Sequence, residues 1–575
     1  MKRIGIIGGG PAALFLYKRI IEHATKPLSV TIFEKKNEIG AGMPYSSAGA
    51  GKEHVTNVSG NEIPALVTPV RDWLSECPSL LLNQFDMEPS MFNDFKVLPR
   101  LLFGEYLAAQ FELLQKAAKK TGIKTVIYYN TFVSDVQYDA NNRVSLIVTE
   151  TGHQLPFDDV VICTGHNWPH QNEGVVAGWY DSPYPPKKLQ QTINFPTAIK
   201  GSSLTAIDAI RTLSRQNGAF TKQQDGMYKY HLNKDSKGFK LVLHSIKGLL
   251  PGMRFHLDDT HLSQGTALTL DQVNAIKDQH HGFVPLDYIF EQHFKQPLRE
   301  KNPAFFERIR QMRLEEFVDA MMAMREELDP MTLFKAEYME AEKSIRTKQS
   351  VHWKELLAIL SYEMNYPAKH FSAEDMLRLK KVLMPLISIV IAFVPQSSAR
   401  ELMALHEAGV LSIIPVEYDS EVVPVQEGGC RYVYSDETGK VHDTYYAMFI
   451  NAVGQPPVMF RNFLFPSLLN TGIISPAQIK FRSVEAAELQ IEEGNNDVVK
   501  LTQHDYYLRV PGININDHFQ VLNDFGVATR HIYIMAVPYI AGLNPDYSGL
   551  DFCDTASERI VQAMLEEKIA DTVAA

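Results

Sequence analysis

The chain has 575 residues, enough for several domains of about 150 residues each, which excludes a single small binding module. Hydrophobic residues make up 45% of it and aromatic residues 10%, so large cores can form and wholesale disorder is excluded. With 56 basic and 67 acidic residues the net charge is −11, which disfavours a chain-wide role in binding nucleic acid, because a phosphate backbone is neutralised by clustered Lys and Arg.

The first thirty-four residues carry the strongest chemical signal. A strand is predicted from Arg3 to Ile7, a helix begins at the glycines that follow, and a second strand from Leu28 to Phe33 ends at Glu34. The turn between the first strand and the helix reads GxGxxA, with the residues Gly8, Gly9, Gly10, Pro11, Ala12 and Ala13. An acid about 20 residues further on completes the fingerprint of a dinucleotide-binding βαβ unit.

Each position of this motif has a physical reason in such a site. Gly8 makes the tight turn, Gly10 lets a pyrophosphate approach the backbone, and Ala13 lets helix and strand pack closely. The N-terminus of the helix, at Pro11 and Ala12, offers unpaired N–H groups and a positive dipole end to the phosphates. Glu34 would accept hydrogen bonds from the ribose hydroxyls. The register of all these parts favours a nucleotide site over a glycine turn in another βαβ unit.

The residues after Glu34 bear on whether the nucleotide is NAD or FAD. A second pair of glycines, Gly40 and Gly42, follows so soon that the loop suits a long cofactor, which favours FAD. We expect Lys35, Gly42 and Met43 to contact it. Arg100, at the start of a predicted helix, is either a further cofactor ligand or a solvated helix start.

The pattern then becomes antiparallel. Strands are predicted at 126–129, 133–138 and 144–149, with a turn at 139–142, and a buried strand that starts at Asp158 ends in Thr164-Gly165. A dinucleotide βαβ unit, a β-meander and a strand ending in Thr-Gly form the layout of flavoproteins with two dinucleotide domains.

Three strings in this region carry a resemblance to a known family. They are Gly42-Met43-Pro44-Tyr45-Ser46, then Leu98-Pro99-Arg100 with Gly104-Glu105-Tyr106, and Thr164-Gly165-His166 with Trp168-Pro169. The region resembles the bacterial FAD/NAD(P)-binding flavoprotein family, distantly related to flavin-dependent N-hydroxylating monooxygenases. The resemblance implies FAD beside Arg100, Thr164 and Gly165, and a substrate near Tyr45, His54 and Asn57.

The same layout occurs a second time. A strand near 197–200 leads to Gly201-x-Ser203-x-x-Ala206 and a helix, a strand follows at 240–244, and later strands and a meander end at Gly454. Two copies imply two nucleotide sites. Because Ser203 replaces the second glycine, the alternative of a relic domain that binds no nucleotide stays open.

Ser245 and Lys247 occupy the place that Glu34 has in the first copy. An acid there would repel the 2′-phosphate of NADP, whereas a hydroxyl and a cation would accept it. This favours NADPH over NADH, and Lys247 as an ordinary surface lysine is the alternative.

Residues 257–395 break the pattern, with helices predicted at 306–327, 333–345 and 353–362. We interpret them as a helical insertion, lying over the second domain, that covers a substrate cleft. His280 and His281 have no third ligand nearby in sequence, so no metal site is expected.

After a strand at 531–536, the resemblance places Asn544, Gly549 and a helix at 551–567 against the flavin ring. For Asn544 and Asp546 the alternative is a surface loop.

These observations predict an α/β fold with two Rossmann-like dinucleotide-binding domains, β-meanders and a helical insertion. The expected parts are an FAD domain at 1–195 and 455–575, a second NAD(P)-type domain at 196–256 and 396–454, and the insertion at 257–395. The predicted function is an FAD-dependent oxidoreductase reduced by NAD(P)H and reoxidised by oxygen or a small-molecule substrate, with monooxygenase chemistry as one form. The alternative is a non-catalytic nucleotide-binding protein.

No single residue is predicted to be the catalyst, as expected where the flavin does the chemistry. The four cysteines are far apart in sequence, which disfavours a disulfide scaffold, a zinc site and a disulfide reductase mechanism. The chain runs from Met1 almost directly into a strand, and its longest apolar run, 382–394, is too short to span a bilayer. We therefore expect a cytoplasmic protein.

Overall fold

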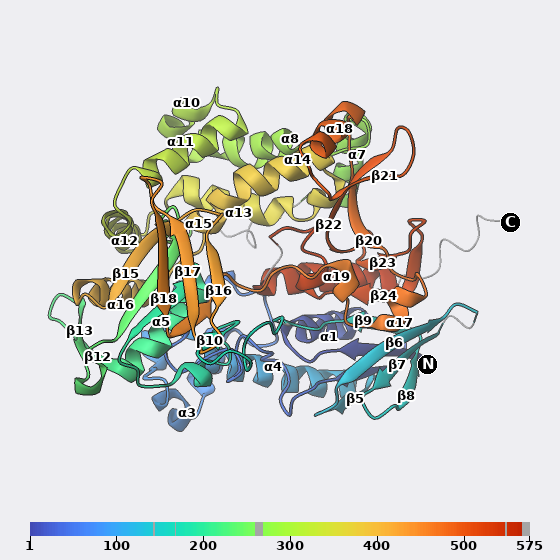
Figure 1. Ribbon diagram of the computed structural model, residues 1–575. Helices are drawn as coiled ribbons and strands as arrows, with labels where there is room; N and C mark the ends of the chain where they lie inside the picture. Colours follow the sequence, from blue (N-terminus) through green and yellow to red (C-terminus); the bar gives the residue numbers. More distant parts are fainter. Residues whose placement is uncertain (142–143, 167, 259–267, 547–548, 566–575) are drawn as a thin grey trace.

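The structure, a computed structural model, describes residues 1–141, 144–166, 168–258, 268–546 and 549–565. The predicted turn residue Asn142, residues 259–267 of the predicted insertion and residues 566–567 of the predicted last helix lie outside these ranges. The described residues form two parallel sheets with their own helices and meanders, and a group of helices beside them (Figure 1). The predicted α/β class with two Rossmann-like units and a helical insertion is confirmed.

The first sheet has six strands in the order β23-β24-β9-β1-β2-β5. Their bounds are β1 Lys2–Ile7, β2 Leu28–Phe33, β5 Lys124–Tyr128, β9 Asp159–Ile162, β23 Gln520–Leu522 and β24 Ala528–Ile534. All pairs are parallel except β23 with β24. Every residue of β9 is buried, as expected for a strand covered on both faces. The carboxyl ends of β1, β2, β9 and β24 thus share one edge.

Three helices cover this sheet. α1 (Pro11–His23) connects β1 to β2, α4 (Arg100–Lys120) precedes β5, and α19 (Gly549–Leu565) follows β24. α19 lies beside α1 (Figure 1), where Arg19 Nη2 is 2.7 Å from Asp554 Oδ1. A meander of β6 (Val133–Asp139), β7 (Val144–Thr149) and β8 (Gln154–Phe157) and a short pair of β3 (Val55–Ser59) and β4 (Val97–Pro99) complete this part.

The second sheet has five parallel strands in the order β10-β19-β11-β14-β15. Their bounds are β10 Trp179–Tyr180, β11 Pro196–Lys200, β14 Lys240–Ile246, β15 Leu411–Val416 and β19 Met448–Asn451. Helices α5 (Leu204–Asn217) and α16 (Gln396–Glu407) pack on it, and β16 (Glu421–Pro424), β17 (Cys430–Ser435) and β18 (Val441–Tyr446) form the second meander. A hairpin of β12 (Gly218–Lys222) and β13 (Tyr228–Leu232) was not predicted.

The helical region, defined here as α7 to α15, lies above both sheets in the view of Figure 1. It consists of α7 Leu270–Gln279, α8 Leu286–Phe290, α9 Gln296–Lys301, α10 Pro303–Ile309, α11 Leu314–Glu326, α12 Pro330–Thr347, α13 His352–Met364, α14 Ala373–Arg378 and α15 Met384–Val390. Two π-helical turns, Glu291–Lys295 and Leu379–Leu383, continue α8 and α14.

The prediction of one helix over 306–327 is wrong, because the chain breaks between α10 and α11. Lys295 Nζ donates to the carbonyl oxygen of Arg310 at 2.9 Å, which satisfies a carbonyl at the end of α10. Glu316 accepts the N–H of Arg313 at 2.8 Å and caps the start of α11. The apolar spacing continues across the break and therefore does not reveal it in the sequence.

A second unpredicted element lies in the C-terminal part of the chain. β20 (Pro476–Lys480), β22 (Tyr506–Ile513) and β21 (Val498–Lys500) form a three-stranded antiparallel sheet, between α17 (Pro466–Asn470) and β23 in sequence, with α18 (Val484–Glu492) beside it. Glu374 of α14 accepts the N–H of Ser483 at 2.8 Å, so this sheet contacts the helical region. Among the described helices, none is long and apolar enough to cross a membrane.

Candidate functional site

The turn after β1 has the backbone geometry of a dinucleotide site. Gly8 has φ +102°, and a Cβ there would lie 2.6 Å from the carbonyl oxygen of Cys163, so only glycine fits. The N–H of Gly8 donates to the carbonyl oxygen of Phe33 at 2.8 Å and ties the turn to the end of β2. α1 begins at Pro11 with Gly10 as its N-cap. Since Gly10 has no side chain, the first N–H groups of α1 are left for a ligand.

The loop after Glu34 lies against this turn. The N–H of Gly40 donates to the carbonyl oxygen of Gly9 at 2.7 Å, and a Cβ on Gly10 would lie 3.3 Å from Gly42 Cα. A Cβ on Gly42 would meet the ring of Pro11 at 2.8 Å. The expected cofactor residue Gly42 therefore lies over the start of α1, where Ala12 is half-buried and Ala13 fully buried. Met43 is half-buried, whereas Lys35 is exposed.

Glu34 is buried at the end of β2 and closes the glycine turn. Its Oε2 accepts the N–H of Gly9 at 2.7 Å, and its Oε1 accepts the N–H of Lys36 at 2.9 Å. The carboxylate thus has a structural role in addition to the predicted bond to a ribose, which stays a prediction.

Thr164 and Gly165 follow β9 at the same edge of the sheet. The hydroxyl oxygen of Thr164 is buried and has no hydrogen-bond partner among the described residues. A Cβ on Gly165 would meet no atom within 4 Å. A buried hydroxyl without a partner is costly, and a cofactor atom at this edge would satisfy it. The residues present therefore fit a dinucleotide along the glycine turn.

Tyr45, in this loop, packs against α4. Its ring packs edge-on against Phe103 at 4.9 Å. Burial raises the pKa of Tyr45 to about 12, with smaller electrostatic effects from Arg100, Cys553 and Asp551. The loop of Tyr45, α4 and α19 are three separate parts of the chain, and the structure brings Arg100, Cys553 and Asp551 within electrostatic range of Tyr45.

Cys163 and Cys553 also lie within electrostatic range of each other, although 390 residues separate them. Burial raises the pKa of both thiols, and Cys553 Sγ donates to the carbonyl oxygen of Gly549 at 3.2 Å. Both cysteines are free in the structure. Their raised pKa disfavours thiolate chemistry.

Arg100 lies in a buried ion pair between the two sheet units. Its Nη1 is 2.5 Å from Asp208 Oδ2 of α5, and the hydroxyl of Tyr184 donates to the same oxygen at 2.7 Å. Burial alone would raise the pKa of Asp208, but Arg100, His54 and Tyr184 hold it below its usual value. In this structure Arg100 is neither a solvated helix start nor free to bind a cofactor phosphate, and a role in binding FAD stays a prediction.

His54 belongs to the same buried cluster. Its Nδ1 accepts the N–H of Gly51 at 3.0 Å, so Nε2 carries the proton and donates to the backbone oxygen of Asp208 at 3.1 Å. With 1% of its surface exposed, His54 offers no free nitrogen to a substrate here. Asn57 is exposed, and its backbone oxygen accepts from Arg254.

The second glycine turn repeats the first in its backbone. Gly201 has φ +99°, and its N–H donates to the carbonyl oxygen of His244 at 2.9 Å, as Gly8 does to Phe33. Ser203 is the N-cap of α5, with no cap bond from its side chain. Ser245 takes the place of Glu34, but it is buried and its hydroxyl is 2.9 Å from Ser202 Oγ.

Lys247 is paired with the helical region. Its Nζ lies 3.1 Å from Oε1 of Glu326, at the end of α11, and 42% of the lysine side chain is exposed. A nucleotide 2′-phosphate at Lys247 would therefore compete with a carboxylate.

The loop between β24 and α19 is not a surface loop at Asn544. Asn544 is fully buried, and Asp546 is half-buried with its pKa raised by burial to about 6. Gly549 begins α19 with φ +83°. Asp551 lies in the first turn of α19, and burial raises its pKa to about 7.

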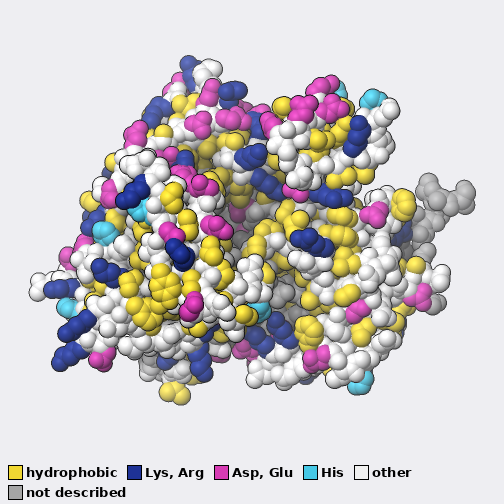
Figure 2. Space-filling view, in the orientation of Figure 1, with side chains coloured by type: hydrophobic (Ala, Val, Ile, Leu, Met, Phe, Trp, Pro, Cys, Tyr) yellow, Lys and Arg dark blue, Asp and Glu magenta, His cyan; other side chains and the backbone are white. Residues whose placement is uncertain are grey.

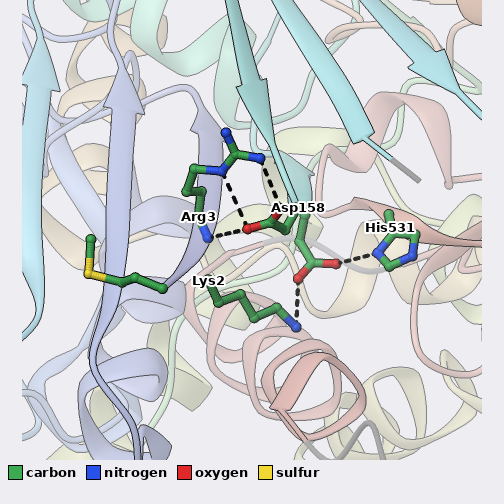
Figure 3. Close-up of a pocket in the computed structure, with 6 residues that line it drawn as sticks. Lys2, Arg3, Asp158 and His531 are labelled. Carbon is green, nitrogen blue, oxygen red and sulfur yellow. Dashed lines mark hydrogen bonds and ion pairs between the residues drawn. The ribbon is translucent and has the colours of Figure 1, made fainter. Parts of the chain in front are cut away.

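A cavity of about 560 Å³ lies at the opposite edge of the first sheet (Figure 3). It is lined by charged groups that pair with one another: Arg3 Nη2 is 3.0 Å from Asp158 Oδ1, and Lys2 Nζ is 2.8 Å from Asp159 Oδ2. Because ligands of parallel sheets bind at the carboxyl ends of the strands, this cavity is not the dinucleotide site. Among the described residues, no group of His, Cys, Asp or Glu is arranged to hold a metal.

Comparison with known proteins bears on the class of this site. Residues 5–167 match the family model described as FAD-NAD(P)-binding, which spans the glycine turn, Glu34, Arg100 and Thr164. Residues 5–167 are an FAD/NAD(P)-binding domain. The match confirms the predicted resemblance and the cofactor class, FAD and NAD(P). Residues 269–391, which span the helical region, match the model described as YdhS-like middle domain.

Several proteins resemble the chain over most of its length. The uncharacterized protein YdhS of Escherichia coli (strain K12) is 28% identical over 476 residues, which is 81% of this chain and 86% of the relative. The FAD-bound cadaverine monooxygenase DfoA of Erwinia amylovora is 12% identical, with a TM-score of 0.45, over 100% of this chain and 98% of the other. The lysine monooxygenase NbtG of Nocardia farcinica is 11% identical, with a TM-score of 0.41, over 97% and 100%.

Sequence reasoning missed several residues around the FAD/NAD(P)-binding domain. Asp208 and Tyr184 reach Arg100 of this domain, Asn365 reaches the loop before α19, and Asp551 was seen only as the start of a helix. One signal was available for Asp208: it stands between Ile207 and Ile210 on the predicted helix, and an acid among apolar positions needs a partner if it is buried. In the structure Asp208 is buried.

Proposed function

We propose that this chain is an FAD-dependent oxidoreductase that takes electrons from NAD(P)H and passes them to oxygen or to a small-molecule substrate. Monooxygenase chemistry is one form of this reaction. The proposal includes a cytoplasmic location and no nucleic-acid or membrane partner. On the face shown in Figure 2, acidic and basic side chains are interspersed, without a broad patch of one sign.

One observation carries the proposal. The glycine turn, the buried hydroxyl of Thr164 and the loop before α19 meet at the carboxyl edge of a domain of the FAD/NAD(P)-binding family. Gly8, Gly10 and the start of α1 would hold the pyrophosphate, Glu34 the ribose, and Thr164 a polar atom of the cofactor. FAD, when bound, supplies reversible one- and two-electron chemistry.

The other residues of the site would bind, orient and exclude water. Tyr45, with its pKa raised to about 12, stays protonated at neutral pH and can donate a hydrogen bond. Asp551, with its pKa raised to about 7, and Asp546, with its pKa raised to about 6, can take up or release a proton near neutral pH.

A second candidate, a nucleotide-binding protein without turnover, is favoured by two observations. Ser203 replaces a glycine of the second turn, and Lys247 is already paired with Glu326. Anaerobic mixing of the purified protein with NADPH, and separately with NADH, distinguishes the two. Loss of the flavin absorbance band supports the oxidoreductase, and an unchanged band with both nucleotides supports the second candidate.

A further inference from the structure

The helical region reaches the carboxyl edge of the first sheet through the end of α13. The N–H of Asp546 donates to Asn365 Oδ1 at 2.7 Å, and Asn544 Nδ2 donates to the backbone oxygen of Asn365 at 2.7 Å. The hydroxyl of Ser361 donates to the carboxylate of Asp546. Three hydrogen bonds thus join α13 to a loop about 180 residues further along the chain.

That loop, residues 544–546, lies between β24 and α19. It follows a strand whose carboxyl end is beside β9, and it leads to the first turn of α19 with Asp551. The hydroxyl oxygens of Tyr362 in α13 and Thr555 in α19 are 2.5 Å apart, so α13 contacts the helix as well as the loop. The helical region therefore touches both elements that lie at the proposed cofactor edge.

Asn544 carries an acceptor that nothing in the described protein uses. The residue is fully buried, and its Oδ1 has no hydrogen-bond partner among the described residues. The partner of its Nδ2 is a carbonyl oxygen, which only accepts, so the orientation of the amide is fixed. Because the amide is planar, the bond to Asn365 also fixes where Oδ1 points.

α13 is itself held firmly in the helical region. Near its start, Lys354 Nζ is 3.0 Å from Glu337 Oε1, with both side chains buried, and Glu355 pairs with Lys301 at 3.1 Å. At its end, Asn365 Nδ2 donates to the backbone oxygen of Ser361 at 2.9 Å. Both ends of the Asn365 amide are thus engaged, and this side chain can act as a rigid support.

We propose that the helical region completes the flavin site, with Asn365 as a positioning residue that sets how residues 544–546 face the cofactor. Asn365 holds the backbone of Asp546 and the side chain of Asn544, and Asn544 Oδ1 is directed to accept a hydrogen bond from FAD. This inference rests on the proposed function, since it needs FAD at the carboxyl edge of the first sheet.

The test measures FAD binding to the apoprotein by fluorescence quenching, together with the visible spectrum of the bound flavin. Asn365→Ala removes the acceptor for the N–H of Asp546, and Ser361→Ala removes one hydroxyl with little change of volume. We expect Asn365→Ala to raise the Kd for FAD about tenfold, the change that one hydrogen bond produces, and to shift the flavin band. Ser361→Ala should shift the band in the same direction.

Asn217→Ala is the matched control. Asn217 is also a fully buried asparagine with both ends engaged: Oδ1 accepts the N–H of Ile193 at 2.8 Å, and Nδ2 donates to the carbonyl oxygen of Leu213 at 2.9 Å. It lies in the second sheet unit, so its loss should lower thermal stability and leave the Kd for FAD within twofold.

Unchanged affinity and spectrum in Asn365→Ala and Ser361→Ala would overturn the inference, as would an equal loss of affinity in Asn217→Ala. If Asn365→Ala does not fold, the flavin band of Ser361→Ala decides. A wild-type apoprotein that binds no FAD would instead contradict the proposed function, and this inference with it.

Discussion

The ion pair between Lys247 and Glu326 leads to a prediction about the second nucleotide site. If the adenosine ribose of NADPH lies at the end of β14, Lys247 faces its 2′-phosphate, and the carboxylate of Glu326 must give way. Lys247→Ala should therefore weaken reduction by NADPH much more than reduction by NADH. Glu326→Gln should strengthen reduction by NADPH, because it frees Lys247 and removes the negative charge that competes with the 2′-phosphate.

The magnitude follows from the geometry. A charge-assisted bond to phosphate contributes about 1.5–3 kcal/mol. Lys247 Nζ lies 3.1 and 3.2 Å from the two oxygens of Glu326, and both side chains are partly exposed, so breaking this pair costs about 0.2–1 kcal/mol. The difference, about 1–2 kcal/mol, corresponds to a five- to thirtyfold loss of NADPH affinity in Lys247→Ala. For Glu326→Gln we expect a gain of up to about fivefold.

The assay is anaerobic flavin reduction at varied NADPH and NADH, at low and high salt. Since an exposed ion pair is screened, added salt should reduce the effect of both substitutions. Equal loss with both nucleotides in Lys247→Ala would show that the lysine only supports the fold. No change with either nucleotide would place the nucleotide elsewhere or leave the second unit without one.

Two further predictions concern the first site. Thr164→Val removes a buried hydroxyl that has no partner among the described residues, so the thermal stability of the apoprotein should stay unchanged or rise. The same substitution should raise the Kd for FAD two- to tenfold, which corresponds to about 0.5–1.4 kcal/mol. Unchanged FAD affinity would contradict the assignment of Thr164 to the cofactor site. Burial raises the pKa of Asp551 from 3.8 to about 7, so the folded apoprotein keeps a proton that the unfolded chain releases, and the stability contribution of this group falls as pH rises from about 4 to about 7. Asp551→Asn should therefore stabilise the apoprotein at pH 8 by at most about 4 kcal/mol, seen as a higher Tm, and should change the Tm little at pH 4. A larger gain in Tm at pH 4 than at pH 8 would be inconsistent with a buried acid.

The local parts of the fold could be predicted from the sequence. β1, α1 and β2 follow one another directly, and the glycines between them are needed for the steric reason seen at Gly8, where a Cβ would collide with Cys163. The Thr-Gly end of β9 and the backbone of the second turn at Gly201 were predicted in the same way, from apolar runs that end in glycine.

What depends on distant contacts could not be predicted. Asp208 lies 108 residues from Arg100, and Lys247 lies 79 residues from Glu326, so neither pair leaves a periodic signal. The break between α10 and α11 depends on a cap from Lys295, in a different helical turn. Asn544 could not be assigned to the interior because its partner, Asn365, belongs to another part of the chain.

The FAD content of the purified protein tests the central claim most directly. We predict one FAD per chain after heat release, and its loss in Gly10→Val, where the added side chain would occupy the approach of the pyrophosphate and crowd Gly42 Cα, 3.3 Å from the Cβ position. Circular dichroism should show that the variant keeps its helices and strands. Wild-type protein that carries no FAD and binds none, or Gly10→Val with full FAD occupancy, would contradict the account.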